Sequence, residues 1–253
     1  MKFDDLDKTM RAYEEALDIV IVPNLPIVVR LDGRGFTSLT KQMKFNKPFD
    51  NEFKERMCYT TQSLIKDTGF NFIYGYTQSD EISLLLHPDD NTFNRKLRKL
   101  NSVLAGEASA CMSVVLNTRA SFDCRVIQLP TLELIQDYFS WRQEDAHRNS
   151  LNSLCFWTLV KEGKTPRAAT SSMKGVTKIE KLKFLLYRNI DFNNIPSWQR
   201  YGIGFYNDSY IKEGFNPITQ ESTMAVRNRL VKDENLLNGA AYREYINSIW
   251  KSS

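Results

Sequence analysis

The sequence has few residues of the types that form zinc sites or disulfide frameworks. Its 253 residues include two histidines and four cysteines, and no two cysteines stand in a Cys-x-x-Cys pair. This spacing excludes a zinc ribbon and a histidine-rich metal site, and we expect the thiols to be buried apolar groups. A metal bound by this chain would use carboxylates, the ligands that suit magnesium, manganese or calcium.

Long hydrophobic runs are also absent. The longest, Ile19–Val22 and Leu25–Val29, fall far below the roughly 20 apolar residues that cross a bilayer. The opening residues Met1–Asp5 contain two aspartates and no apolar run, unlike a secretory signal. We therefore expect a cytoplasmic protein with no membrane association. Hydrophobic residues make up 42 % of the chain, which is typical of a globular protein with a substantial core.

Positive charge is unevenly distributed along the chain. The net charge is only +4, but residues 161–188 contain eight basic and two acidic residues. Four further cations lie between Arg95 and Lys99. A polyanion such as RNA would meet these patches first. An isolated basic cluster is as often a solvated helix face, so both interpretations stay open.

Hydrophobic periodicity predicts alternating helices and strands. Apolar residues three or four apart predict helices over residues 4–18, 49–66, 92–115 and 131–162, with shorter basic helices up to residue 187. Apolar runs predict strands over residues 27–31, 122–129 and 201–206, and a hairpin of residues 70–76 and 81–86. This order indicates an α+β fold. We expect a catalytic core over residues 1–130 and a helical region over residues 131–253 packed on it, while residues after Asp208 show no assignable pattern.

Two acidic segments stand at the ends of predicted strands. Asp32 follows the first strand, and Asp80 and Glu81 lie in the turn of the predicted hairpin. If these strands are neighbours in one sheet, the acids repel each other, and bound divalent cations would stabilise them. Two metal ions about 3.5–4 Å apart support phosphoryl transfer. A single aspartate in such a position is more often a turn former or a helix cap.

The residues after Asp32 suit the binding of a triphosphate. Gly33 and Gly35 permit tight backbone geometry, so backbone N–H groups can turn toward phosphate oxygens. Arg34 and Lys47 can reach the same oxygens. The segment is not a Walker loop, because no Gly-Lys-Ser/Thr ending follows.

His147 stands in a polar stretch of a long predicted helix, beside Asp145, Arg148 and Asn149. Such a stretch either lines a nucleotide site or forms an exposed helix face, and the sequence leaves both open. The ordinary pKa of histidine would allow a general base here. A two-metal site does not need one, so we assign His147 a contact role.

Six separate segments carry a family resemblance, and they occur in one order: residues 29–36, 46–48, 78–81, 122–126, 137–143 and 152–157. They include Asp32-Gly33-Arg34-Gly35-Phe36 and Gln78-Ser79-Asp80-Glu81. Together these segments resemble tRNA-histidine guanylyltransferase and its relatives, the guanylyltransferase-like 3′-5′ polymerases. Several motifs in the same order are far more specific than any one of them.

The resemblance implies a polymerase-palm-like antiparallel sheet covered by helices, with an additional C-terminal helical region, usually in a homotetramer. It implies that nucleotides are added to the 5′ end of tRNA in the 3′-to-5′ direction, after ATP or GTP activates the 5′-phosphate. It also implies two Mg²⁺ ions, or Mn²⁺, held by Asp32, the Gly33 carbonyl and Asp80, with Glu81 in support.

The resemblance and the polar helix together predict two sets of binding residues. We expect nucleotide contacts from Asp32, Gly33, Arg34, Gly35, Phe36, Thr37, Lys47, Ser79, Asp80, Glu81, Lys96, Lys99, His147 and Asn149. The phosphate that Lys96 and Lys99 meet belongs either to the nucleotide or to tRNA. We expect tRNA contacts from Arg30, Arg125, Arg148, Lys174, Lys178 and Lys181.

One motif departs from the family pattern. Eukaryotic guanylyltransferases carry His-Ile-Asn-Asn where this chain has His147, Arg148, Asn149 and Ser150. The change favours template-dependent repair of 5′-truncated tRNA over addition of an untemplated guanosine to tRNA-histidine. Two other classes remain. A nucleotide cyclase with a palm-like core would not need basic tracks, and in a non-catalytic RNA-binding module the clustered carboxylates would repel RNA.

Overall fold

The structure is a computed structural model that describes residues 2–216 and 221–252. Its helices are α1 (Phe3–Glu15), α2 (Phe36–Gln42), α3 (Asn51–Asp67), the short 3₁₀ helix η1 (Thr92–Arg95), α4 (Leu97–Leu116), α5 (Leu132–Lys161), α6 (Pro166–Met173), α7 (Lys178–Leu186), α8 (Ser197–Tyr201) and α9 (Gly239–Lys251). Its strands are β1 (Ile27–Gly33), β2 (Phe72–Gln78), β3 (Glu81–Leu86), β4 (Phe122–Gln128), β5 (Ile203–Asn216) and β6 (Glu221–Asp233).

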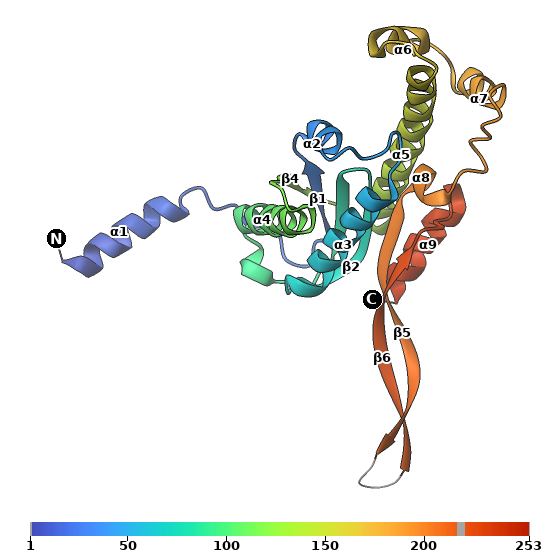
Figure 1. Ribbon diagram of the computed structural model, residues 1–253. Coiled ribbons are helices and arrows are strands. Elements are labelled where there is room, and N and C mark those ends of the chain that lie inside the picture. Colours follow the sequence, from blue (N-terminus) through green and yellow to red (C-terminus); the bar gives the residue numbers. More distant parts are fainter. Residues whose placement is uncertain (1, 217–220, 253) are drawn as a thin grey trace.

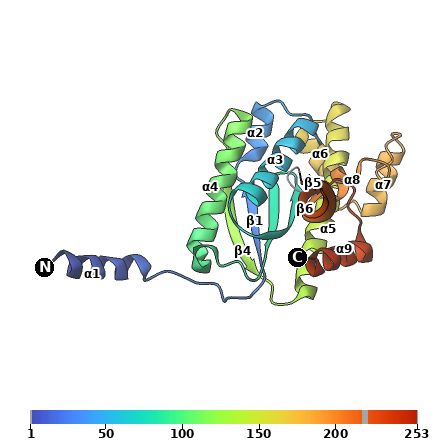
Figure 2. The same ribbon diagram turned by 90° about the horizontal axis from the view of Figure 1, so that it is seen from below.

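The described strands form one sheet in the order β4-β1-β3-β2-β5-β6, and each neighbouring pair is antiparallel. Helices lie around this sheet (Figures 1 and 2). The expected α+β fold is therefore confirmed. Because β1 lies between β3 and β4, the end of β1 and the start of β3 come side by side although they are far apart in sequence.

Both faces of the sheet are hydrophobic. Val29, Leu31 and Ile82 belong to the larger core cluster, which also contains residues of α3 and α4. Val28 and Leu85 belong to a second cluster with residues of α5 and α9. Burial on both sides explains why β1 and β3 appear in the sequence as continuous apolar runs instead of alternating patterns.

The helix α5 is the longest element that positions the site. It begins at Thr131, whose hydroxyl oxygen accepts a hydrogen bond from the Leu134 N–H. Its 30 residues correspond to about 45 Å, so its C-terminal half extends beyond the sheet to α6 and α7 (Figure 1). There Leu151 and Cys155 pack with Leu185 in a separate small core.

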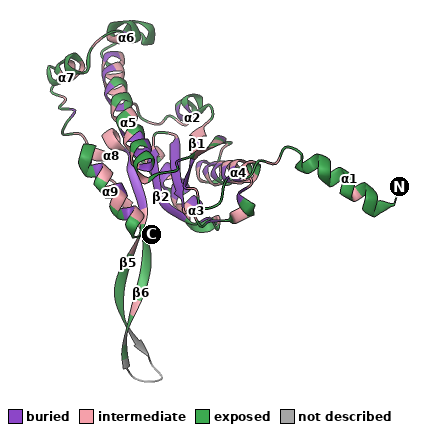
Figure 3. Ribbon diagram, turned by 180° about the vertical axis from the view of Figure 1, so that it is seen from behind, coloured by how far each residue is buried: buried purple, intermediate pink, exposed green. Residues whose placement is uncertain are grey.

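Two parts of the chain project from the body, α1 and the distal half of the β5–β6 hairpin (Figures 1 and 3). No residue of α1 is buried. The hairpin pairs from Gly204 with Asp233 to Asn216 with Glu221. The C-terminal part of the chain is thus not helical throughout, since a long hairpin joins its helices. Within the described residues, no helix is long and apolar enough to cross a membrane.

Most cations of the basic cluster at residues 95–99 contact other groups of the same chain. The predicted helix over residues 92–115 is interrupted there, because Phe93, Asn94 and Arg95 have φ values of 54°, 53° and 54°. The Arg95 side chain is 1 % exposed and donates hydrogen bonds to the carbonyl oxygens of Leu25, Pro88 and Asp90. Lys96 and Arg98 both pair with Asp18. Arg98 still keeps 53% of its side chain exposed, so only part of this cluster is open to a polyanion.

Candidate active site

The register of the sheet brings the two acidic segments together. Asp32, near the end of β1, is the cross-strand partner of Glu81 at the start of β3. The Gly33 N–H donates a hydrogen bond of 3.0 Å to the carbonyl oxygen of Asp80. Only Ser79 and Asp80 join β2 to β3, and Ser79 has a φ of 55°, a left-handed conformation that costs about 1–2 kcal/mol for residues other than glycine. The turn thus holds Asp80 beside the end of β1.

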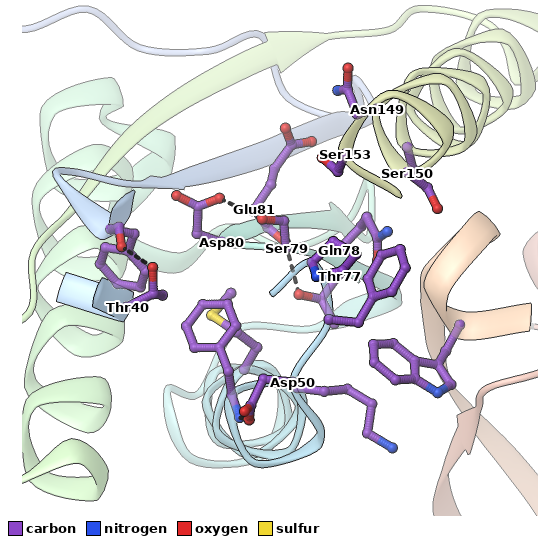
Figure 4. Close-up of a pocket in the computed structure, with 18 of the residues that line it drawn as sticks. Thr40, Asp50, Thr77, Gln78, Ser79, Asp80, Glu81, Asn149, Ser150 and Ser153 are labelled. Atoms are coloured by element: carbon purple, nitrogen blue, oxygen red, sulfur yellow. Dashed lines mark hydrogen bonds between the residues drawn. The ribbon is translucent and has the colours of Figure 1, made fainter. Parts of the chain in front are cut away.

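A cavity of about 530 Å³ lies next to these acids. Figure 4 shows the β2–β3 turn, with Ser79, Asp80 and Glu81, between α3 and the helix α5 that carries Asn149 and Ser153. The volume lies in the range of small-molecule and cofactor sites. Carboxylates, hydroxyls, amides, cations and aromatic rings all line it, so the cavity offers partners for the phosphates, ribose and base of a nucleotide.

The surroundings of Asp80 destabilise the ionised form of its carboxyl group. Burial raises the pKa of its carboxyl group, and the nearby Asp32 carboxylate raises it as well. The Ser79 hydroxyl donates a hydrogen bond of 2.9 Å to Asp80 and opposes this shift. Two neighbouring acids, one of them desolvated, form a site that a cation stabilises.

The oxygen atoms at this edge of the sheet fit Mg²⁺ or Mn²⁺. The carboxylates of Asp32 and Asp80 and the adjoining Gly33 carbonyl are hard donors. Among the residues that the structure describes, no three His, Cys, Asp or Glu side chains form a metal-binding group. A Mg²⁺ ion at this edge would need water molecules or substrate phosphates as further ligands, which this ion commonly has.

Glu81 takes a different position from that of a metal ligand. Its two carboxylate oxygens accept hydrogen bonds of 2.7 and 2.8 Å from Arg142 and one of 2.5 Å from Arg30. Arg142 also binds Asp145 at 3.1 Å. Burial raises the pKa of Glu81, and the two guanidinium groups oppose its protonation. Glu81 thus links β3 to α5 and fixes the wall of the cavity.

Lys47 supplies positive charge on another side of the cavity. Its amino group donates a hydrogen bond of 2.7 Å to the hydroxyl of Thr40. Burial lowers the pKa of Lys47, whereas the carboxylates of Asp80 and Asp50 act in the opposite direction. Within the described part of the chain Lys47 has no ion pair within 4.0 Å, so its charge is available to a phosphate.

The structure brings many of the predicted residues to this cavity. Those that line it are Arg30, Asp32, Phe36, Thr37, Lys47, Ser79, Asp80, Glu81 and Asn149. Gly33, Arg34 and Gly35 continue directly from Asp32. Arg30 faces Glu81, and Arg125 is its cross-strand neighbour on β4. His147, Arg148, Lys178 and Lys181 line a second cavity, and Lys174 is exposed at the end of α6.

Lys96 and Lys99 are not brought to the acids. Lys96 follows Arg95, which binds the Leu25 carbonyl just before β1, and the acids lie at the opposite end of that strand. The six residues from Ile27 to Asp32 span about 17 Å. Within one chain, these two lysines therefore lie toward the other end of β1 from Asp32, and their contact with phosphate stays a prediction.

Sequence reasoning missed several residues of the cavity wall. Arg142 was recoverable, because an arginine within the apolar stripe of a long helix needs an acidic partner. Trp198 gave no such signal. Its ring lies 6.0 Å from that of Phe49, and the Lys54 ammonium lies 5.1 Å from the Trp198 ring centre. These contacts join segments about 150 residues apart, and no local pattern marks them.

Comparisons with known proteins identify the family of this chain. The family model described as tRNAHis guanylyltransferase matches residues 7–130, and the Thg1 C terminal domain matches residues 133–240. The probable tRNA(His) guanylyltransferase of Dictyostelium discoideum is 33% identical over 194 residues, which cover 72% of this chain and 75% of that protein. The tRNA(His) guanylyltransferase of Saccharomyces cerevisiae is 32% identical over 72% of this chain and 83% of its own length.

Solved structures show the same fold. The crystal structure of the Saccharomyces cerevisiae enzyme has a TM-score of 0.70 at 29% identity and covers 76% of this chain and 90% of that one. A bacterial tRNA(His) guanylyltransferase (Thg1)-like protein in complex with ATP has a TM-score of 0.74 at 28% identity, covering 96% of this chain and 98% of that one. The chain therefore belongs to the tRNAHis guanylyltransferase family and is a nucleotidyltransferase.

Proposed function

We propose that this protein adds nucleotides to the 5′ end of tRNA in the 3′-to-5′ direction, with the opposite strand as template. The observation that carries the proposal is the placement of Asp32, near the end of β1, beside Asp80, in the β2–β3 turn, at a cavity of about 530 Å³. Lys47 lines the same cavity. The bacterial Thg1-like protein was solved in complex with GTP and with ATP, which supports a nucleotide in the corresponding cavity here.

Two phosphoryl transfers make up the proposed reaction. First, the 5′-phosphate of the RNA attacks the α-phosphate of ATP or GTP, and pyrophosphate leaves. Then the 3′-hydroxyl of an incoming nucleoside triphosphate attacks the activated 5′-phosphate, and the nucleoside monophosphate leaves. The RNA grows by one nucleotide, which carries a new 5′-triphosphate.

Residues of the cavity have distinct roles in these transfers. Asp32, Asp80 and the Gly33 carbonyl would hold two Mg²⁺ or Mn²⁺ ions, which activate the attacking oxygen and stabilise the leaving oxygen when bound. Lys47 neutralises triphosphate charge from another side. Glu81 keeps α5 in place through Arg142, so Asn149 faces the cavity.

Template dependence is supported by the extent of the similarity. The bacterial Thg1-like structure with GTP covers 97% of this chain and 98% of its own, at 27% identity. The structure of the Saccharomyces cerevisiae enzyme covers 76% of this chain. Ser150 also stands where the eukaryotic motif has asparagine. These observations favour the Thg1-like branch and hence repair of 5′-truncated tRNA.

Addition of one untemplated guanosine to tRNA-histidine is the second candidate function. The names of the eukaryotic relatives favour it, since those proteins are called tRNA(His) guanylyltransferases. The same cavity and the same two transfers would serve this activity, and only the choice of nucleotide would differ.

One experiment separates the two functions. A labelled tRNA that lacks its first 5′ nucleotide is incubated with ATP, Mg²⁺ and each nucleoside triphosphate in turn, and the base opposite the gap is varied. Template-dependent repair predicts that the added nucleotide always complements that base. Addition of guanosine whatever the opposite base would support the second function. If RNA is not extended and cyclic nucleotide forms, both are wrong.

A homotetramer also remains part of the proposal. Phe3, Leu6, Met10 and Tyr13 recur at helical spacing on α1 and are all exposed. An exposed apolar stripe of this kind favours burial against another surface. Light scattering of the full chain should give four times the mass of 29.4 kDa.

A further inference from the structure

A second cavity, of about 760 Å³, takes no part in the reaction proposed above. Among the residues that the structure describes, Asp145 alone lines both cavities. Arg142, Asn149 and Ser153 of α5 face the first cavity, whereas Glu144 and Arg148 face the second. At 100° per residue, these two sets occupy opposite sides of α5. The helix therefore separates two binding spaces.

The second cavity contains a pair of stacked rings. The His147 imidazole lies on the Tyr201 ring with a centre-to-centre distance of 5.3 Å and an interplanar angle of 20°. Phe192 supports the imidazole edge-on at 5.2 Å. Burial lowers the pKa of His147, and the positive charges of Lys178 and Arg200 lower it further. The imidazole is therefore neutral near pH 7. The Arg200 guanidinium lies over the Tyr201 ring, 5.0 Å from its centre, so the stack consists of planar groups of the kind on which nucleobases lie.

Two unpaired cations line the same cavity. Lys178 and Lys181 lie one turn apart on α7, and both line the cavity. In the ranges 2–216 and 221–252, neither lysine has an ion-pair partner within 4.0 Å. The acid beside them, Asp145, is already bound to Arg142, Arg148 and Asn149. Glu144 also lines the cavity, so one further carboxylate accompanies the two lysines, but among the described residues the cavity has no free carboxylate pair.

We propose that this cavity binds an unpaired nucleotide of the RNA substrate, with its base on the stacked rings of His147 and Tyr201 and its phosphate near Lys178 and Lys181. The inference rests on the proposed function. A free nucleoside triphosphate travels with Mg²⁺ and fits the carboxylates of the first cavity better. A phosphodiester carries one charge and needs only the lysines. The helix α5 is about 10–12 Å across, so a few nucleotides of one strand can span both cavities.

The test uses the full chain and two RNA hairpins with the same stem. One hairpin is blunt, and the other has four unpaired nucleotides at its 3′ end. Fluorescence anisotropy gives the Kd of each. We expect the wild-type protein to bind the second hairpin about tenfold more tightly, since one stacked base contributes about that factor.

Three variants locate this preference. Tyr201→Leu should remove the tenfold preference and leave the blunt hairpin unaffected, while Tyr201→Phe should retain it. Lys178→Glu should weaken binding of the unpaired end more than binding of the blunt hairpin. Lys183→Glu is the matched control, because Lys183 is an exposed residue of α7 that does not line the cavity. Thermal unfolding of each variant checks that it is folded.

The outcomes separate this inference from the proposed function. If Tyr201→Leu and Lys178→Glu keep the full preference while the protein still extends truncated tRNA, the inference alone is wrong. If they instead weaken binding of labelled GTP and spare the RNA preference, the cavity holds a free nucleotide and the inference is also wrong. If the preference depends on Tyr201 but no RNA is extended, the RNA subsite stands and the proposed reaction fails.

Discussion

Asp32 and Glu81 are cross-strand partners, but only Glu81 is fully neutralised by arginine. Glu81 accepts hydrogen bonds from Arg142 and Arg30, whereas Asp32 has one contact of 3.8 Å with Arg30 and keeps 42% of its side chain exposed. The protein therefore neutralises Glu81 internally but not Asp32 or the partly buried Asp80, which fits the cation site of the proposed function.

Replacing Asp80 with Asn should stabilise the metal-free protein at pH 7. The pKa of Asp80 is raised in the folded state, so its ionised form opposes folding at every pH above its ordinary value of 3.8. The Tm should rise by about 2–4 °C for each kcal/mol gained. Below pH 3.8 the difference should vanish, because Asp80 is then protonated in both states. An unchanged Tm at pH 7 would contradict the burial of a charged Asp80.

With Mg²⁺ present, the wild-type protein should be more thermally stable than the Asp80→Asn variant. Wild-type protein should gain thermal stability on addition of Mg²⁺, while Asp80→Asn should gain none and should lose nucleotide addition. Because protons compete with the ion for Asp80, the Mg²⁺ affinity should fall as pH drops through the raised pKa. Calorimetric titration across this pH range measures the effect. Asp89→Asn, an exposed change outside the cavity, serves as the control.

Arg142→Met should destabilise the protein by about 3 kcal/mol. Removing one partner of a buried ion pair costs roughly 3–5 kcal/mol, and the low end applies because Arg30 still binds Glu81. Urea denaturation measures the loss. The double variant Arg142→Met with Glu81→Gln should recover part of it, because no uncompensated charge then remains. If the double variant loses more free energy of unfolding than the two single variants together, the pairing of Arg142 with Glu81 is refuted.

Gly33→Ala should impair nucleotide binding, and Gly35→Ala should do so far less. A Cβ at Gly33 would lie 2.6 Å from the Phe36 ring and 2.9 Å from the Asp80 Cβ, so it would displace the acid. A Cβ at Gly35 would meet nothing within 4 Å. Its φ of +74° adds only backbone strain of about 1 kcal/mol. Fluorescent nucleotide binding compares the two variants, and equal effects would argue against the steric explanation.

Lys47→Gln should raise the KM for the nucleoside triphosphate about 10- to 100-fold, the range expected for loss of one hydrogen bond between charged groups. The Thr40 contact of Lys47 lies within the cavity wall, so the fold should survive the change. Lys41→Gln removes the same charge from an exposed position of α2 and should leave KM unchanged. Steady-state kinetics at varied nucleotide concentration give the KM of both variants.

Local patterns were sufficient for most of the core. Residues of β1, β3 and α5 pack into the core clusters, so the apolar residues of these elements form clear patterns in the sequence. The distal hairpin gave no such signal, because side chains such as Ile211, Met224 and Val226 face solvent and have no core to alternate against. The helix break at Arg95 was missed for a similar reason, since the Arg95 side chain binds the carbonyl oxygen of Leu25, 70 residues away in sequence.

The acids of the site were predictable, and the walls of its cavity were not. Asp32 and Asp80 stand at strand ends, where sequence position alone indicates a shared edge once the strands pair. The separation of His147 from Asn149 into two cavities depends on which side of α5 faces the sheet. That orientation follows from tertiary packing, and a stretch of polar residues does not encode it.

The pairing of β5 with β6 allows the hairpin to change in length without a change in the rest of the fold. β5 pairs with β2 only from Ile203 to Tyr206, and in the described residues beyond that point it pairs with β6 alone. Residues can therefore be inserted or deleted in facing pairs without altering the register of the rest. The length of the projecting hairpin can therefore vary while the candidate active site stays the same.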